Sequence, residues 1–506
     1  MHSEIIKNIW ILCSGTFVQK IITFVALGYY ARTFDASEIA IIPLYYLVTN
    51  LSHVVLGFGV QAYIMKTVPE LLYSDPKKAK ILINKILLIA YISGVIFGVV
   101  FFIVSKHYTV SSELDLLTVI GIVGFSIGAA FECMNATQRE ILTAAKKVKK
   151  LAVLLVVKTI LLPLLIICLY DNLKADGIAV AMACVSVISC VITRFMLGSL
   201  VKNNICSNEI TFLSIFSESW PYYIESGLML LRRQGDQIVI VSFMGTEALG
   251  IYFVAQRLGE MMWSFVVQID AVLTPELSKK AGESLQSLKE IFSVLVKVAL
   301  YVITPIVIVC TCLVPMYIYL ISGDRYGSAS IPAAILCIKV LPEIIRVTII
   351  GRVVLVSCSA LSRLKLTLVD LVILIPFSVI SAVNDQLPLV ALAPIVSAIG
   401  SSIFGYYLLK SNFEAEFPVS RTVICIVNMA ISLYAGNLVI NNIESAIVGP
   451  IIASVVSMTI YIILFINSVD LKDYRLVINR ILPSRINQFS DALLVLRIAG
   501  WSRMNG

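Results

Sequence analysis

The sequence has few of the residues from which metal centres are built. Its 506 residues contain three histidines, His2, His53 and His107, which lie far apart. Among eleven cysteines, Cys310 and Cys312 form the only close pair, and their spacing matches no zinc or redox motif. We therefore expect neither a metal nor a cofactor.

Charged residues are also scarce, at 14% of the chain, whereas 59% of the chain is hydrophobic. Apolar runs long enough to cross a bilayer as a helix recur along the whole length. Only a short segment, residues 1–7, precedes residues 8–30, which are long enough to span the membrane as a helix. We therefore expect a retained first transmembrane helix and no cleavable signal peptide. The composition predicts an all-α polytopic membrane protein.

Polar residues, glycines and prolines divide the chain into fourteen predicted transmembrane helices. Their approximate bounds are 8–31, 39–66, 81–105, 114–136, 151–170, 177–200, 219–243, 248–274, 291–313, 331–356, 366–383, 387–409, 421–440 and 445–468. An even number of helices places both termini on the same side of the membrane.

The positive charges indicate which side that is. Loops that follow even-numbered helices, together with the termini, hold most lysines and arginines outside the helices, including the runs 77–80 and 146–150. The opposite loops hold only Arg32, Lys106, Lys174 and Arg325. Because basic loops stay in the cytoplasm, we predict a protein of the cell (inner) membrane with both termini cytoplasmic. The charge surplus therefore reflects topology, and we expect no nucleic-acid partner.

The loops leave little room for extramembrane chemistry. The longest external loop, around 314–330, is too short for a catalytic domain, so we expect that the protein is not an enzyme. The tail 469–506 mixes apolar and basic positions, which favours one or two helices on the cytoplasmic leaflet, with a disordered tail as the alternative.

A weak internal repeat suggests two related halves. Thr67-Val68-Pro69-Glu70-Leu71 at the end of the second helix resembles Leu273-Thr274-Pro275-Glu276-Leu277 at the end of the eighth. The separation of six helices predicts parallel lobes related by an axis along the membrane normal. We predict an N-lobe at 1–205, a C-lobe at 206–415, two extra helices within 416–468 and the tail at 469–506.

Several stretches resemble the multidrug/oligosaccharidyl-lipid/polysaccharide (MOP) exporter superfamily, and within it the Wzx-type polysaccharide flippases. The stretches are Leu56-Gly57-Phe58-Gly59, Gly235-Asp236-Gln237-Ile238-Val239-Ile240, the run from Gly245 to Leu258, Pro275-Glu276-Leu277-Ser278, and Ser322-Gly323-Asp324-Arg325-Tyr326-Gly327-Ser328-Ala329.

The resemblance implies two lobes around a central cavity and flipping of a lipid-linked oligosaccharide by alternating access, as in O-antigen biosynthesis. It implies that the last two helices, 421–440 and 445–468, form a groove for the lipid tail. The partners that it implies are membrane lipids, a polyprenyl-pyrophosphate-linked glycan, and a polysaccharide polymerase and glycosyltransferases.

Charged residues inside the predicted helices are the candidate site. A charge at the bilayer centre costs roughly 2.5–3.5 kcal/mol even on a lenient scale, so such residues line a wet or protein-enclosed space. A surplus of cations suits an anionic substrate such as a pyrophosphate, which arginine binds in a bidentate manner. The candidate substrate-binding residues are Lys20, Arg232, Arg233, Arg257, Arg346 and Lys339.

The acidic residues in the same helices are candidates for coupling to Na⁺ or H⁺, namely Glu225, Asp236, Glu260, Glu343 and Asp370. Similar flippases hold sodium between acidic residues of helices seven and eleven, which would nominate Asp236 and Asp370. Simple rise counting separates those two by roughly 20 Å in depth, which argues against the pair.

The charged residues also have a structural interpretation. Arg232–Asp236, Arg257–Glu260 and Glu343–Arg346 have the spacing of structural ion pairs within one helix. Lys158 lies close enough to a predicted helix end to snorkel. Glu132 lies near the predicted cytoplasmic mouth, where the alternatives are that it admits the substrate's head group or that it caps a helix.

The rival functions are a cation-coupled drug exporter, which favours twelve helices and an acidic cavity, and a polytopic polysaccharide polymerase or ligase, which needs a large outer loop.

Overall fold

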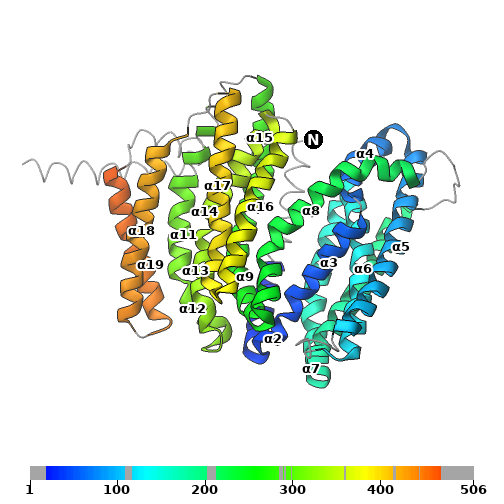
Figure 1. Cartoon of the computed structure of the whole chain (residues 1–506), viewed down its shortest axis with the longest axis horizontal. Coiled ribbons are helices and arrows are strands. Elements are labelled where there is room, and N and C mark those ends of the chain that lie inside the picture. Colours follow the sequence, from blue (N-terminus) through cyan, green and yellow to red (C-terminus); the bar gives the residue numbers. More distant parts are fainter. Residues whose placement is uncertain are drawn as a thin grey trace, which may run out of the picture. The chain divides into compact units, whose positions relative to one another are not determined.

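The computed structural model describes residues 19–57, 59–108, 117–201, 212–283, 289, 292–293, 295–297, 299–357, 360–413, 417–443 and 445–468. Every regular element among these residues is a helix (Figure 1), which confirms the all-α polytopic fold. The start of the first predicted helix and the tail at 469–506 lie outside the described residues.

The chain divides into two compact units, residues 1–253 and 254–506. The boundary between these units lies inside one long helix, α9 (Gly245–Glu283). The lobe bounds inferred from the repeat, at 205/206 and 415/416, stay predictions.

The first unit contains the helical residues 19–33 and the elements up to the start of α9. These elements are α2 (Ala36–Ile39), α3 (Ile41–Gly57), α4 (Val60–Ser74), α5 (Pro76–Tyr108), α6 (Val119–Ala144), α7 (Val148–Val201) and α8 (Phe212–Phe243). α7 holds two helices joined at Lys174, whose φ of 50° and ψ of −128° are not helical, and they correspond to the fifth and sixth predicted helices. α6 packs along α3, α4, α5 and α7 and is the centre of the unit.

The second unit continues from α9 to α19. Its elements are η1 (Ala299–Ile303), α11 (Thr304–Cys312), α12 (Val314–Ser322), η2 (Gly327–Ala329), α13 (Ser330–Ile338), α14 (Val340–Glu343), η3 (Ile344–Ile350), α15 (Gly351–Ser357), α16 (Ala360–Val383), α17 (Leu387–Phe413), α18 (Val419–Asn442) and α19 (Val448–Ser468). The tenth predicted helix is thus a succession of short segments, in which η3 is π-helical. α16 pairs with α17, and α18 pairs with α19.

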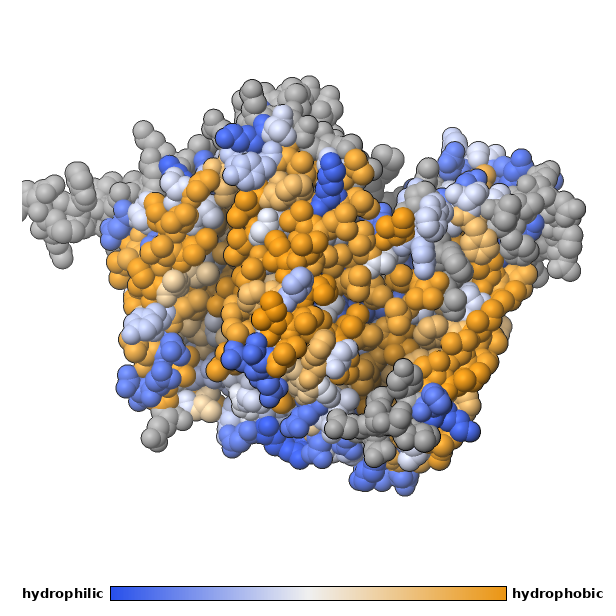
Figure 2. All heavy atoms as spheres, viewed as in Figure 1, coloured by the Kyte–Doolittle hydropathy of each residue, from blue (hydrophilic) through white to orange (hydrophobic). Residues whose placement is uncertain are grey.

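The outer sides of these helices are apolar. In the described part of the chain, nine helices are long and apolar enough to cross a membrane. Hydrophobic side chains cover the sides of the helices, whereas hydrophilic ones gather near the helix ends (Figure 2). This distribution is that of a multi-pass membrane protein, because a lipid-exposed surface must be apolar over the hydrocarbon thickness.

One glycine of the family-like stretches has a clear structural reason. Gly59 separates α3 from α4 with a left-handed backbone, at φ 72°. A Cβ at this position would lie 2.5 Å from the backbone oxygen of Ser219 on α8. Only glycine fits both the backbone conformation and the close approach of the two chain segments.

Candidate functional site

Among the residues that the structure describes, ion pairs between helical residues form two clusters and one separate pair. We call them the Glu132 cluster (Glu132, Arg139 and Lys158), the Arg346 cluster (Arg346, Glu343 and Asp370) and the Arg257 pair (Arg257 and Glu260). The Glu132 cluster belongs to the first unit, and the other two belong to the second.

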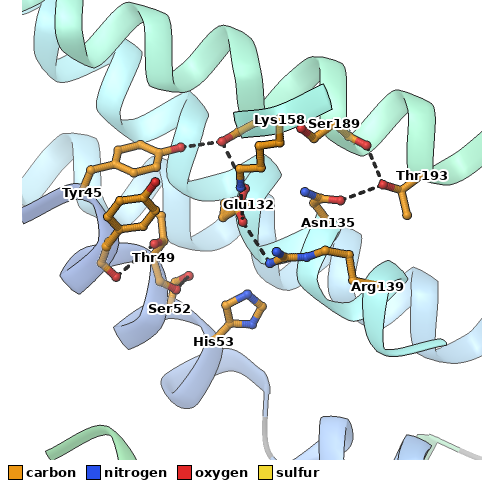
Figure 3. A network of polar contacts seen from close by, with 12 residues as sticks. Tyr45, Thr49, Ser52, His53, Glu132, Asn135, Arg139, Lys158, Ser189 and Thr193 are labelled. Carbon is orange, nitrogen blue, oxygen red and sulfur yellow. Dashed lines mark hydrogen bonds and ion pairs between the residues drawn. The ribbon is translucent and has the colours of Figure 1, made fainter. Parts of the chain in front are cut away.

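In the Glu132 cluster one carboxylate binds two cations (Figure 3). Lys158 Nζ on α7 lies 2.7 Å and 2.8 Å from the two Glu132 oxygens, and an Arg139 Nη lies 3.0 Å from one of them. The Ser186 hydroxyl also donates to Glu132, at 3.2 Å, and is itself bonded to Tyr45 OH at 2.7 Å. Two cations and one carboxylate leave a formal charge of +1.

Neutral polar side chains extend this cluster across five helices. Gln61 Nε2 donates to His53 Nδ1 at 2.7 Å, and Thr193 donates to Asn135 Oδ1 at 2.9 Å. Gln138 donates to Tyr91 OH at 3.0 Å. Because α3 to α7 all contribute, the first unit has a polar interior rather than a purely apolar core.

The position of this cluster corrects the interpretation of Glu132 and Lys158. α6 continues to Ala144, so Glu132 lies near its middle, about 18–20 Å from either end at 1.5 Å per residue. Lys158 lies about 15 Å from the start of α7 and binds Glu132 instead of snorkelling to the interface. The sequence predicts that this helix ends at residue 136, since polar residues follow it, but those residues form the inward face of α6.

The Arg346 cluster lies where the tenth predicted helix becomes π-helical. Arg346 is 6% exposed, pairs with Glu343 on the preceding turn, and lies 3.2 Å from Asp370 on α16. The Ser401 hydroxyl on α17 lies 3.5 Å from the other Asp370 oxygen. One cation between two carboxylates gives a formal charge of −1. A π-helical segment at a buried ion pair is typical of functional sites.

The Arg257 pair is the more exposed one. Arg257 and Glu260 are 2.6 Å apart on α9, with side-chain exposures of 24% and 38%. Two of the predicted substrate-binding residues, Arg257 and Arg346, therefore have carboxylate partners in the spacing expected for structural ion pairs.

The remaining predicted residues differ in burial. Asp236 is buried on α8. It accepts hydrogen bonds from Tyr252 OH, at 2.5 Å, and from the backbone N–H of Gln237, at 2.9 Å. Glu225 and Arg232 on α8 are half-buried, and Arg233 is exposed. Lys20 and Lys339 are half-buried. Asp236 belongs to the first unit and Asp370 to the second.

The fold is that of an all-α multi-pass membrane protein with buried ion pairs between its helices. The sequence profile described as "Polysaccharide biosynthesis protein" matches residues 5–281, more than half of the chain, and the chain belongs to that family. This match confirms the predicted resemblance to polysaccharide flippases of the MOP superfamily. No curated protein matches the sequence.

Solved structures show the same fold. The chain is similar to the lipid II flippase MurJ in an inward closed conformation, with 15% identity, a TM-score of 0.63, and 90% of this chain and 97% of that one covered. It is similar to an inward-facing multidrug resistance MATE family transporter of the MOP superfamily, with 15% identity, a TM-score of 0.65, and 78% and 95% covered. A MOP superfamily transporter from Pyrococcus furiosus matches at 16% identity and a TM-score of 0.56, with 80% and 95% covered.

Proposed function

We propose that this transporter flips a polyprenyl-pyrophosphate-linked oligosaccharide from the cytoplasmic to the outer leaflet by alternating access. The carrying observation is a net positive cluster in which Arg139 and Lys158 bind Glu132, a carboxylate near the middle of a membrane-spanning helix. An apolar or cationic drug gains nothing from such a cluster, whereas a diphosphate replaces lost hydration with charge-assisted hydrogen bonds. Membership of a polysaccharide biosynthesis family supports a glycan as the remainder of the substrate.

The two units carry opposite formal charges at their buried clusters. The Glu132 cluster suits the anionic head of the substrate, and the Arg346 cluster, with its two carboxylates, suits a coupling cation. A cation that binds near Glu343 and Asp370 would compete with Arg346 for them, and only such a difference in binding between two states can drive a cycle. We propose Na⁺ or H⁺ for this role.

The flipping test uses the full chain in liposomes. A polyprenyl-diphosphate disaccharide with a dithionite-sensitive fluorophore is placed in both leaflets, and dithionite is added outside. We expect the protected fluorescence to fall faster than in empty liposomes, while a phospholipid with the same fluorophore stays protected. Protection equal to that in empty liposomes, under an imposed Na⁺ or H⁺ gradient of either direction, would overturn the proposal.

The multidrug alternative is tested in the same vesicles. Uptake or efflux of an organic cation such as ethidium, without movement of the diphosphate lipid, would establish an exporter of the drug class instead. We expect no ethidium flux above that of empty liposomes, because the buried cluster of the first unit is cationic.

A further inference from the structure

We infer that Glu132 is a resident counter-anion, which an incoming diphosphate replaces at Arg139 and Lys158. This inference rests on the proposed function and deepens it, because it assigns the residues that bind the substrate's phosphates. Sequence patterns alone nominate none of the three as a phosphate ligand. They place Glu132 near the cytoplasmic mouth, Lys158 near a helix end and Arg139 in a loop.

The three side chains of the cluster differ in solvent exposure. Arg139 is 27% exposed and Lys158 is 17% exposed, whereas Glu132 is 7% exposed. The two cations are therefore more exposed than the carboxylate that they share. A ligand that reaches the cluster can contact the guanidinium and the ammonium more readily than it can contact Glu132.

The hydrogen bonding of the cations is incomplete. Within the described part of the chain, Arg139 makes one side-chain hydrogen bond, to Glu132, although its guanidinium carries five N–H donors. A phosphate accepts two of these donors in parallel, which a single shared carboxylate oxygen does not. A phosphate thus offers Arg139 and Lys158 more hydrogen-bond acceptors than the Glu132 carboxylate does.

One neutral donor beside the cluster is also unused by the described residues. Asn135 is fully buried, and its Nδ2 makes no hydrogen bond there. A buried donor without an acceptor is costly, and a polyatomic anion offers it an acceptor.

Glu132 has a hydrogen-bond donor other than the two cations, which remains when a diphosphate binds them. The Ser186 hydroxyl already donates to it at 3.2 Å, and Tyr45 supports that hydroxyl at 2.7 Å. The carboxylate thus keeps a hydrogen bond when the cations turn to phosphate. Because it returns to the cations when the ligand leaves, Glu132 weakens binding and speeds release.

The test is diphosphate binding by the purified full-length protein, measured by calorimetry with geranyl diphosphate, inorganic pyrophosphate and geraniol. We expect Glu132→Gln to bind geranyl diphosphate about tenfold more tightly than the wild type, since it frees two cations from one charge-assisted partner. We expect Lys158→Met and Arg139→Gln to bind at least about tenfold more weakly. Geraniol, which lacks phosphate, should distinguish none of the variants.

Glu247→Gln is the matched control, because it also removes one carboxylate, at the exposed start of α9. It should bind as the wild type does. Unchanged or weaker binding by a folded Glu132→Gln protein would overturn the inference. Binding of inorganic pyrophosphate as tight as that of geranyl diphosphate would assign the site to a free anion instead of a lipid, and would overturn the substrate assignment.

A charge exchange keeps the test decisive if Glu132→Gln fails to fold. The double variant Glu132→Lys with Lys158→Glu keeps one Glu–Lys pair and the net charge, but moves the carboxylate from α6 to α7 and removes the carboxylate that Arg139 binds at position 132. We expect it to fold and to lose binding, whereas a purely structural cluster would leave binding unchanged. If the wild type binds geranyl diphosphate but liposomes show no flipping, the proposed function fails and the present inference stands.

Discussion

At the scale of single residues, burial decides what an ion pair contributes. Arg346 and Asp370 are nearly inaccessible, and Arg346 lies between two carboxylates. Removing one partner of a buried pair is strongly destabilising because the remaining charge stays buried and unpaired. Arg257 and Glu260 remain partly exposed, and pairs of that kind contribute little to stability.

This contrast gives a prediction on stability. Arg346→Met should lower the free energy of unfolding by about 3–5 kcal/mol, because Glu343 and Asp370 then lose the buried cation that they share. Arg257→Met, with the same change of side chain, should cost about 1 kcal/mol or less. Thermal unfolding of both proteins in one detergent measures the difference. Equal losses would show that Arg346 is not the centre of a buried network.

The residue scale also shows what sequence patterns could find. The intrahelical spacing of Arg257 with Glu260 and of Glu343 with Arg346 predicts ion pairs that the structure contains. The pairing of Arg346 with Asp370, and of Lys158 with Glu132, joins residues far apart in the chain. Such contacts leave no local signal. The signal for Glu132 and Arg139 is their seven-residue spacing, which becomes visible only once α6 is known to continue beyond residue 136.

At the scale of helices, close backbone contacts set where elements begin. The break between α3 and α4 falls within a stretch that the sequence predicts as one continuous helix, 39–66. Hydropathy does not reveal such a break, since apolar residues continue on both sides of it. Gly57 and Gly59 are both candidates for it, and the structure assigns the left-handed turn to Gly59.

Two glycine substitutions separate these roles. Gly59→Ala should destabilise the protein by roughly 1–3 kcal/mol, because a Cβ strains the left-handed backbone and meets the backbone of α8. Gly57→Ala should be neutral or slightly stabilising, since nothing lies within 4 Å of the position that its methyl group would take and alanine favours a helix. The midpoint of thermal unfolding compares the two. A loss in Gly57→Ala as large as in Gly59→Ala would place the essential turn elsewhere.

At the scale of the whole molecule, membrane solvation explains why so much of the fold follows from the sequence. Spans must be apolar and helical, so their number and order can be read from composition. Each of the fourteen predicted spans coincides at least in part with described helical residues, and α7 contains two of them. The polar interior of the first unit does not follow from the sequence, because helix order does not determine which helix faces meet.

The orientation in the membrane is the remaining whole-molecule prediction, and it follows from loop charge. If both termini are cytoplasmic, the turns at Lys174 and Asp385 face outward, while Lys146 and Lys410 face the cytoplasm. All four side chains are exposed, so access to a reagent depends on the side of the membrane and not on burial. In a background with every cysteine replaced by serine, one cysteine is introduced at each of these positions.

Intact cells are then treated with a membrane-impermeant maleimide. We expect Lys174→Cys and Asp385→Cys to be labelled, and Lys146→Cys and Lys410→Cys to react only after the membrane is opened. The reverse pattern would place the basic loops outside, against the asymmetry on which the orientation depends. Because each unit contributes one outward and one inward position, a mixed pattern would show that the two units do not share the parallel topology that the repeat predicts.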